Sequence, residues 1–231
     1  MTGLRILHVD DEPDIREVVE LSLGLDPAFT VKSCASGGDA LAMVPNWRPD
    51  LILCDVMMPV MDGPATLARL RESPETARIP VVFMTARAQA REMDHFKSLG
   101  ATGVIAKPFD PLTLAAFVRR QLHTAGIAAL REGFLKRLRA DAMALATLRR
   151  ERAEETPPDA ALDHVRSFAH QLAGSAGIFG FQQIGTAAGA LEKVLDGEPA
   201  VSPDAIERAL DALLAYIDDE WQRALVPVGN A

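Results

Sequence analysis

In the first half of the chain, short apolar runs alternate with segments whose apolar residues recur at helical spacing. One run, Leu51–Cys54, is apolar throughout, which is typical of a strand covered on both sheet faces. The predicted strands are Leu4–Val9, Phe29–Cys34, Leu51–Cys54, Ile79–Met84 and Gly103–Ala106, and the predicted helices are Glu12–Leu23, Asp39–Val44, Pro64–Arg71, Glu92–Leu99 and Pro111–Leu122. This fivefold βα alternation predicts a parallel five-stranded sheet with helices on both faces.

From Ile127 onwards the spacing is helical and strand patterns are absent. Glycines and prolines divide this part into four helical segments, at about 127–153, 158–178, 181–196 and 203–224. Four helices with short connections predict an all-α, up-and-down four-helix bundle. The sequence therefore predicts an α/β domain at 1–123, a short linker at 124–126 and a helical domain at 127–231.

Composition adds that the chain is an ordinary globular protein of 231 residues, 48% hydrophobic and 24% charged. The two cysteines, Cys34 and Cys54, lie in strand-like runs, so we expect buried thiols in a reducing compartment. No apolar run reaches the roughly 18 residues of a membrane helix, and the N-terminus lacks the pattern of a signal peptide. These features predict a cytoplasmic protein without membrane insertion.

Charge argues against one class of partner. The net charge is −8, and residues 1–123 carry 13 basic and 16 acidic side chains while residues 124–231 carry 11 and 16. Neither part has the positive excess that binding to a phosphate backbone requires, so we expect no nucleic-acid partner.

Polar side chains gather where the predicted strands end. Asp10 and Asp11 follow the first strand, Asp55 the third, Thr85 the fourth and Lys107 the fifth. Sites in open parallel sheets form at this edge. Three neighbouring carboxylates repel one another, and a divalent cation with oxygen ligands, Mg²⁺, resolves that repulsion. A carboxylate such as Asp55 can then attack phosphorus and form an acyl phosphate, with Lys107 adding positive charge and Thr85 a hydrogen bond.

The segment 4–122 closely resembles the receiver domain of two-component response regulators, a flavodoxin-like (βα)₅ fold. The resemblance rests on Val9-Asp10-Asp11-Glu12, Asp55-Val56-Met57-Met58-Pro59, Asp62-Gly63, Thr85-Ala86 and Lys107-Pro108-Phe109. It implies that Asp55 is the phosphoacceptor, that Asp10, Asp11 and the backbone carbonyl of Met57 bind Mg²⁺ with Asp55, and that the bond before Pro108 is cis. One position departs from the family: Val104 stands where a switch aromatic is common.

In the helical half, His170 is surrounded by small residues, and Gly174 lies one turn further along the same helix face. A glycine within a helix costs roughly 1 kcal/mol, which close approach by another backbone would explain. An exposed imidazole on such a surface can accept a phosphoryl group, because its pKa near neutrality makes the neutral nucleophile available.

Residues 127–224 resemble a histidine phosphotransfer domain. The matching residues are His170, Leu172, Gly174, Ser175 and Gly180, with Leu191-Glu192 downstream. The family lysine three residues after the histidine is Ala173 here. Arg166 lies one turn before His170, and we hypothesise that it stabilises the phosphoryl group instead.

The favoured function is a phosphorelay in which Asp55 and His170 carry phosphate, with a sensor histidine kinase, another receiver or another phosphotransfer protein as partner. We expect no enzyme activity beyond self-phosphorylation and slow autodephosphorylation. A homodimer could form through the receiver domain. The alternative is a binding switch, in which Asp55 phosphorylation controls a helical docking module and His170 never carries phosphate. An aspartyl phosphohydrolase is disfavoured because Met57 replaces the second acid that such enzymes usually carry.

Overall fold

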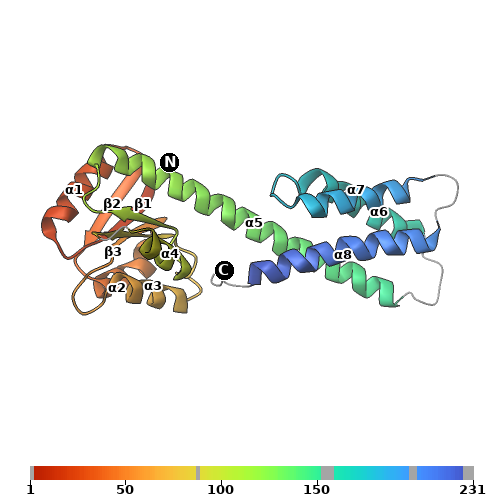
Figure 1. Cartoon of the computed structure of the whole chain (residues 1–231), viewed down its shortest axis with the longest axis horizontal. Helices are drawn as coiled ribbons and strands as arrows, with labels where there is room; N and C mark the ends of the chain where they lie inside the picture. The colour runs from red at the N-terminus through yellow and green to blue at the C-terminus, as the bar shows by residue number, and fades with distance from the viewer. Residues whose placement is uncertain (1–2, 87–88, 152–158, 198–201, 226–231) are drawn as a thin grey trace. The chain divides into compact units, whose positions relative to one another are not determined.

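The computed structural model describes residues 3–86, 89–151, 159–197 and 202–225 (Figure 1). The chain divides into two compact units, Met1–Ile127 and Ala128–Ala231. Among the described residues, no helix has both the length and the apolar character that a membrane crossing demands.

The first unit is a parallel five-stranded sheet in the order β2-β1-β3-β4-β5. Its elements are β1 (Leu4–Val9), α1 (Pro13–Gly24), β2 (Phe29–Cys34), α2 (Gly37–Trp47), β3 (Leu51–Asp55), α3 (Gly63–Glu72), β4 (Val81–Thr85), α4 (Ala90–Ser98), β5 (Gly103–Ala106) and the first part of α5 (Pro111–Glu151). The predicted (βα)₅ architecture is confirmed.

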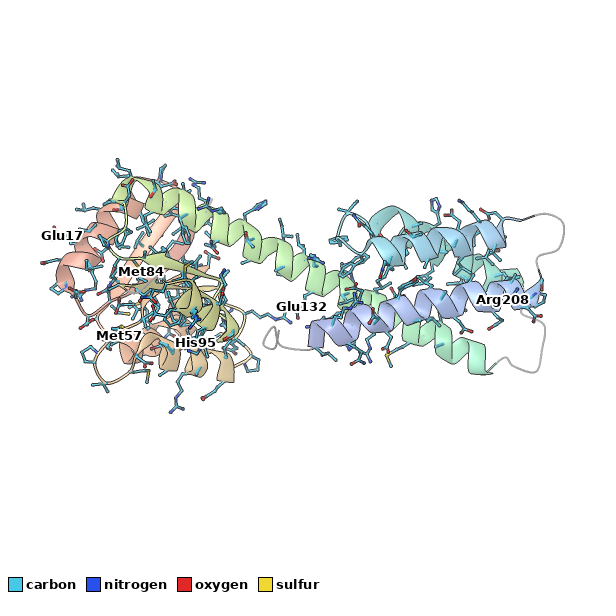
Figure 2. The ribbon with its side chains drawn as sticks, viewed as in Figure 1. Glu17, Met57, Met84, His95, Glu132 and Arg208 are labelled. Atoms are coloured by element: carbon cyan, nitrogen blue, oxygen red, sulfur yellow. The ribbon has the colours of Figure 1, made fainter. Side chains whose placement is uncertain are left out.

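Each sheet face has its own apolar core. On one face α1 and α5 pack through Val19, Leu23 and Leu114. On the other face α2, α3 and α4 pack on residues such as Phe83. Met84, labelled in Figure 2, is completely buried within β4. Burial on both faces explains why the central strands read as continuous apolar runs.

Local chemistry sets the helix ends that position the loops. Ser36 caps α2 by accepting a hydrogen bond from the backbone N–H of Asp39 at 3.1 Å, and the Asp62 carboxylate caps α3 in the same way at 2.7 Å from the N–H of Ala65. Helix α2 runs to Trp47, three residues beyond the predicted end. Pro45 lies in its last turn and lacks the N–H that would bond to the preceding turn.

The predicted linker at 124–126 is helical in the structure. Helix α5 is continuous from Pro111 to Glu151, so the two helices predicted on either side of the linker form one element. The segment contains one glycine, Gly126, but one glycine costs a helix only about 1 kcal/mol relative to alanine. No proline lies beside Gly126 that would end the helix.

The second unit is helical, with α6 (Asp159–Ser175), α7 (Gln182–Leu195) and α8 (Pro203–Leu225) following α5. The four helices share one apolar core, which includes Leu138, Leu172, Leu191 and Leu213. Helix α6 ends three residues before its predicted end, because residues 176–180 form turns that close at Gly180, with φ of +80°. The predicted end of one helix at 153 and start of the next at 158 lie outside the described residues.

Candidate functional site

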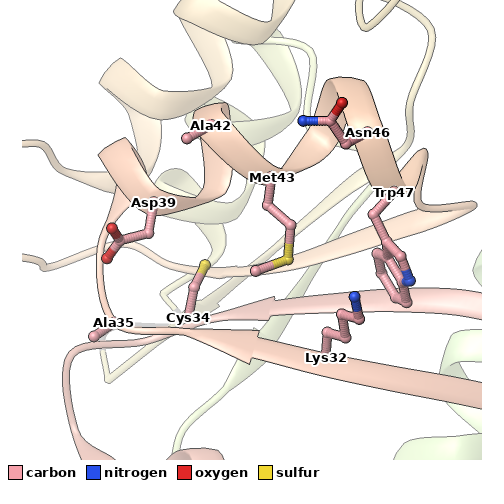
Figure 3. A pocket seen from close by; sticks show the side chains of 8 residues that line it. All are labelled: Lys32, Cys34, Ala35, Asp39, Ala42, Met43, Asn46 and Trp47. Atoms are coloured by element: carbon pink, nitrogen blue, oxygen red, sulfur yellow. The ribbon is translucent and has the colours of Figure 1, made fainter.

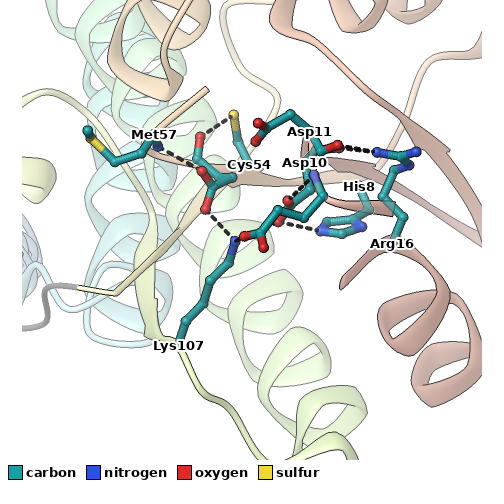
Figure 4. A network of polar contacts seen from close by, with 9 residues as sticks. His8, Asp10, Asp11, Arg16, Cys54, Met57 and Lys107 are labelled. Carbon is teal, nitrogen blue, oxygen red and sulfur yellow. Dashed lines mark hydrogen bonds and ion pairs between the residues drawn. The ribbon is translucent and has the colours of Figure 1, made fainter. Parts of the chain in front are cut away.

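Adjacent strands bring the predicted acidic residues to one edge of the sheet. Asp10 follows β1, Asp55 ends β3 and Thr85 ends β4, while Lys107 follows β5. All strands are parallel, so their carboxyl ends meet at this edge (Figure 4). Backbone hydrogen bonds extend the ladder to it, from the N–H of Asp10 to Cys34 at 3.1 Å and from the N–H of Val56 to Met84 at 3.0 Å.

Lys107 pairs with two buried carboxylates at once. Its Nζ lies 2.7 Å from Oδ2 of Asp10 and 2.5 Å from Oδ1 of Asp55. The side chains of Asp10 and Asp55 are 0% and 8% exposed, and that of Lys107 is 12% exposed. One ammonium therefore neutralises one of two buried negative charges, and this small cluster keeps an excess negative charge.

This pairing separates the behaviour of the two carboxyl groups. Burial raises the pKa of Asp10, but the nearby His8 imidazole and Lys107 ammonium outweigh burial, so the pKa falls below its ordinary value. Burial also raises the pKa of Asp55, and there it prevails over the hydrogen bond with Lys107. Burial lowers the pKa of Lys107, yet its two carboxylate partners raise it overall. Of the two carboxyl groups, Asp55 is therefore the one that takes up a proton more readily.

Backbone groups fix the remaining carboxylate oxygens. The N–H of Met57 donates to Oδ2 of Asp55 at 2.7 Å, and the N–H of Glu12 donates to Oδ1 of Asp10 at 3.0 Å. The Arg16 guanidinium donates to the backbone carbonyls of Asp10 at 2.7 Å and of Asp11 at 3.0 Å. Both loops are therefore held in place before any ligand arrives.

The structure places the other predicted residues around this centre. Thr85 is buried, 3% exposed, at the end of the strand beside Asp55. The peptide bond between Lys107 and Pro108 is cis, as the resemblance implied. The side chain of Asp11 is only partly buried. Arg16 was not among the predicted site residues, because a lysine or arginine on a surface helix carries no sequence signal for reaching back to a loop.

The donors of this edge suit Mg²⁺. Three carboxylates and the Met57 carbonyl supply only hard oxygen ligands. Within the described part of the chain, however, no three acidic, histidine or cysteine side chains converge closely enough to hold a metal as they stand. Lys107 instead supplies the positive charge between Asp10 and Asp55. The residues fit the metal by chemistry and charge.

Gly63 shows how closely α3 approaches this site. A Cβ at Gly63 would lie 2.5 Å from the carbonyl oxygen of Asp55 and 3.0 Å from Cα of Val56. Only glycine permits that contact, because the opposing atoms are backbone. The Asp62-Gly63 motif thus combines a helix cap with a close approach to the end of β3.

The two cysteines are buried and free, as predicted. Burial raises the pKa of Cys34 to about 11 and raises that of Cys54 further. Both thiols are therefore protonated at neutral pH and are poor nucleophiles. A shallow pocket between β2 and α2 includes Cys34 and Asp39, with Lys32 lying 5.1 Å from the ring centroid of Trp47 (Figure 3). This pocket shares no residue with the acidic edge, the edge of the sheet that carries Asp10, Asp11 and Asp55.

In the helical unit, His170 is exposed on α6 and paired with an acid on α7. Its ring Nδ1 lies 2.6 Å from Oε1 of Glu192, and its side chain is 75% exposed. A Cβ added at Gly174 or Gly177 would meet nothing within 4 Å. The glycines are therefore not required by contacts within this unit, and both lie exposed in the segment that follows His170.

The structure does not bring Arg166 into a contact with His170. The guanidinium of Arg166 donates to Asp163 at 3.0 Å, to Asp196 at 3.1 Å and to the carbonyl of Leu195 at 2.9 Å. It thereby satisfies a carbonyl at the C-terminal end of α7, where a cation is also favoured by the helix dipole. Its predicted contact with a phosphoryl group stays a prediction.

Comparison with known proteins decides the family. A model of the response regulator receiver domain matches residues 6–119, and a model of the Hpt domain matches residues 129–220. The chain belongs to the response regulator receiver family and carries an Hpt domain. This combination is that of two-component phosphorelay signalling proteins.

Individual relatives match the first unit. Response regulator Rre1 of Synechocystis sp. is 37% identical over 119 residues, 52% of each chain. An uncharacterized 14.6 kDa protein of Leptolyngbya boryana is 33% identical over 120 residues, 52% of this chain and 91% of that protein. A signal receiver domain from Vibrio parahaemolyticus, 22% identical, has the same fold with a TM-score of 0.50, covering 55% of this chain and 96% of that one. The chain spans about half the length of curated relatives such as Rre1.

Proposed function

We propose that Asp55 accepts a phosphoryl group in a Mg²⁺-dependent reaction and that His170 exchanges phosphate with a receiver. The main observation that supports this proposal is the arrangement of charged side chains at the acidic edge. A buried carboxylate lies 2.5 Å from a lysine ammonium and beside a second buried carboxylate. That arrangement suits an acceptor whose product gains further negative charge close to cations.

In the proposed transfer to Asp55, the phosphoryl donor is a phosphohistidine. A carboxylate oxygen of Asp55 attacks phosphorus, the P–N bond breaks and its electron pair returns to the imidazole of the donor. Lys107, which pairs with Asp55, would pair with an oxygen of the arriving group, and the hydroxyl of Thr85, on the strand beside Asp55, would donate a hydrogen bond to it. Asp10, Asp11, Asp55 and the Met57 carbonyl would hold Mg²⁺, which supplies positive charge to the transferring oxygens.

The chemistry of His170 follows from its contact with Glu192. A carboxylate 2.6 Å from Nδ1 favours the tautomer that carries the proton on that nitrogen. The lone pair of Nε2 is then free for phosphorus, and the same carboxylate stabilises the charge that develops on the ring. The missing side chains at Gly174 and Gly177 would let the backbone of another domain approach at these two positions.

A second candidate is the binding switch, in which the helical domain only docks. It is favoured by two observations on the described residues. Ala173 occupies the position of the family lysine and is partly buried beside α7, and Arg166 is engaged by two acids. Neither of these residues supplies His170 with a cation.

We propose the receiver at 1–123 and the Hpt-like domain at 127–231 as the functional units, joined within α5. The proposed partners are a sensor histidine kinase and other receiver or Hpt proteins, with no nucleic acid. Intrinsic activity is limited to self-phosphorylation and slow hydrolysis of the acyl phosphate. A cytoplasmic location and a homodimer through the receiver stay predictions.

The test is phosphate labelling of the full chain by a radiolabelled phosphohistidine donor, with Asp55→Ala and His170→Ala as variants. Acyl phosphate is labile in alkali, and phosphohistidine is labile in acid. A phosphorelay gives an alkali-labile label that Asp55→Ala removes and an acid-labile label that His170→Ala removes. Label confined to Asp55 with every donor and acceptor supports the binding switch, and no label on Asp55 contradicts both functions.

A further inference from the structure

A histidine lies inside the sheet directly before the acidic edge. His8 belongs to β1, between β2 and β3, and is 0% exposed. Its register partners are Ser33 on β2 and Leu53 on β3. Among the described residues, neither ring nitrogen of His8 has a hydrogen-bond partner, and neither does the hydroxyl of Ser33.

An unpaired imidazole in this place is costly. Its nitrogens lose their water without a hydrogen bond in return, and such groups in folded proteins call for an explanation. Ile6, the β1 residue on the same sheet face as His8, is apolar and fully buried, so an apolar residue at position 8 would suit the sheet. Stability of the fold therefore does not account for His8.

The imidazole faces one polar group of the site. Its Nε2 lies 3.7 Å from Oδ2 of Asp10, beyond hydrogen-bond length (Figure 4). That same oxygen accepts a hydrogen bond from Lys107 at 2.7 Å, while Oδ1 is held by the backbone of Glu12. Oδ2 of Asp10 thus has Lys107 as its present partner and His8 close behind it.

We propose that His8 is a positioning residue for Asp10, donating Nε2–H to Oδ2 when Lys107 leaves that oxygen. The inference rests on the proposed function, in which Lys107 turns towards the phosphoryl group and Asp10 towards Mg²⁺. An approach of roughly 0.8 Å would bring Nε2 to the usual hydrogen-bond length of about 2.9 Å. The buried imidazole then keeps the carboxylate aimed at the metal, as the outer partners of metal ligands do.

Three variants separate this role from a structural one. His8→Leu removes the hydrogen-bond donor and also removes the unpaired polar group. Mg²⁺ affinity should therefore fall, while the stability of the fold should not. His8→Gln keeps an N–H donor on a long side chain and should retain most of the affinity. Ser33→Ala is the matched control, because it removes the neighbouring unpaired hydroxyl without touching Asp10.

The experiment is a Mg²⁺ titration of the full-length chain, followed by NMR at the backbone amides of Asp11 and Met57, with thermal unfolding recorded in EDTA. We expect His8→Leu to weaken Mg²⁺ binding about tenfold with an unfolding temperature no lower than that of the wild type. His8→Gln should stay within about threefold of the wild type, and Ser33→Ala should be unchanged.

Unchanged Mg²⁺ affinity in His8→Leu would overturn the proposal, and so would an equal loss in Ser33→Ala. If His8→Leu does not fold, His8→Asn takes its place, since the shorter amide falls short of Asp10 while His8→Gln does not. Equal affinity of those two variants would then count against the proposal. A wild-type chain whose amides do not respond to Mg²⁺ would instead contradict the proposed function itself.

Discussion

Replacing Lys107 by methionine should destabilise the receiver domain and make its stability strongly dependent on Mg²⁺. Methionine keeps much of the side-chain length and removes the charge. Asp10 and Asp55 would then lie buried beside each other without the ammonium that contacts both oxygens. Removing one partner of a buried ion pair costs about 3–5 kcal/mol, and we expect about 3 kcal/mol. The lower end applies because Asp55, whose pKa is already raised, can take up a proton.

The assay is urea unfolding of the full chain in EDTA, read by tryptophan fluorescence. The two tryptophans lie in different units, Trp47 in the first and Trp221 in the second. A Trp221→Phe background therefore leaves Trp47 as the reporter of the receiver domain. The free energy of unfolding is compared between Lys107 and Lys107→Met in this background, with the exposed Lys97→Met as a control that should change it by less than about 0.5 kcal/mol.

Adding Mg²⁺ completes the test. The divalent cation should stabilise Lys107→Met more than the parent, because in the parent the ammonium already occupies the same pair of carboxylates. The reasoning is refuted if Lys107→Met unfolds like Lys97→Met in EDTA. It is equally refuted if Mg²⁺ stabilises the variant no more than the parent.

Three further substitutions probe the site and its surroundings. Glu192→Ala should slow phosphotransfer through His170 by roughly tenfold, because Nδ1 loses its carboxylate, and an unchanged transfer rate would exclude this role. Gly63→Ala should destabilise the receiver by about 1–3 kcal/mol in urea unfolding and slow labelling of Asp55, since the new Cβ meets backbone at 2.5 Å; wild-type stability would contradict that contact. Val60→Gly should stabilise the receiver by about 1 kcal/mol, because a β-branched residue at φ of +67° is strained; a lower midpoint would argue against strain.

The sequence was sufficient to predict the sheet and its acidic edge, for a physical reason. Apolar runs mark the buried strands, and in a parallel sheet the residues that follow them meet at one edge, whatever the details of packing. Asp10, Asp55, Thr85 and Lys107 were predicted to lie together in this way, and the structure places them at adjacent strand ends.

What the sequence could not reveal depends on energies and contacts outside any motif. The continuity of α5 depends on whether one glycine outweighs the helical residues around it. The engagement of Arg166 depends on Asp163 and Asp196, the latter 30 residues away. The isolation of His8 depends on what β2 and β3 place beside it. Each of these three features can be determined only from the folded structure.

The most direct test of the central claim, that Asp55 lies in a Mg²⁺-dependent phosphoacceptor site, is an NMR titration with beryllofluoride. This compound mimics a phosphoryl group on a carboxylate. With Mg²⁺ present, the amide peaks of Asp55, Met57 and Thr85 should shift, and they should not do so with beryllofluoride alone or with an Asp55→Asn chain. Peaks that stay in place at saturating Mg²⁺ and beryllofluoride would contradict the account.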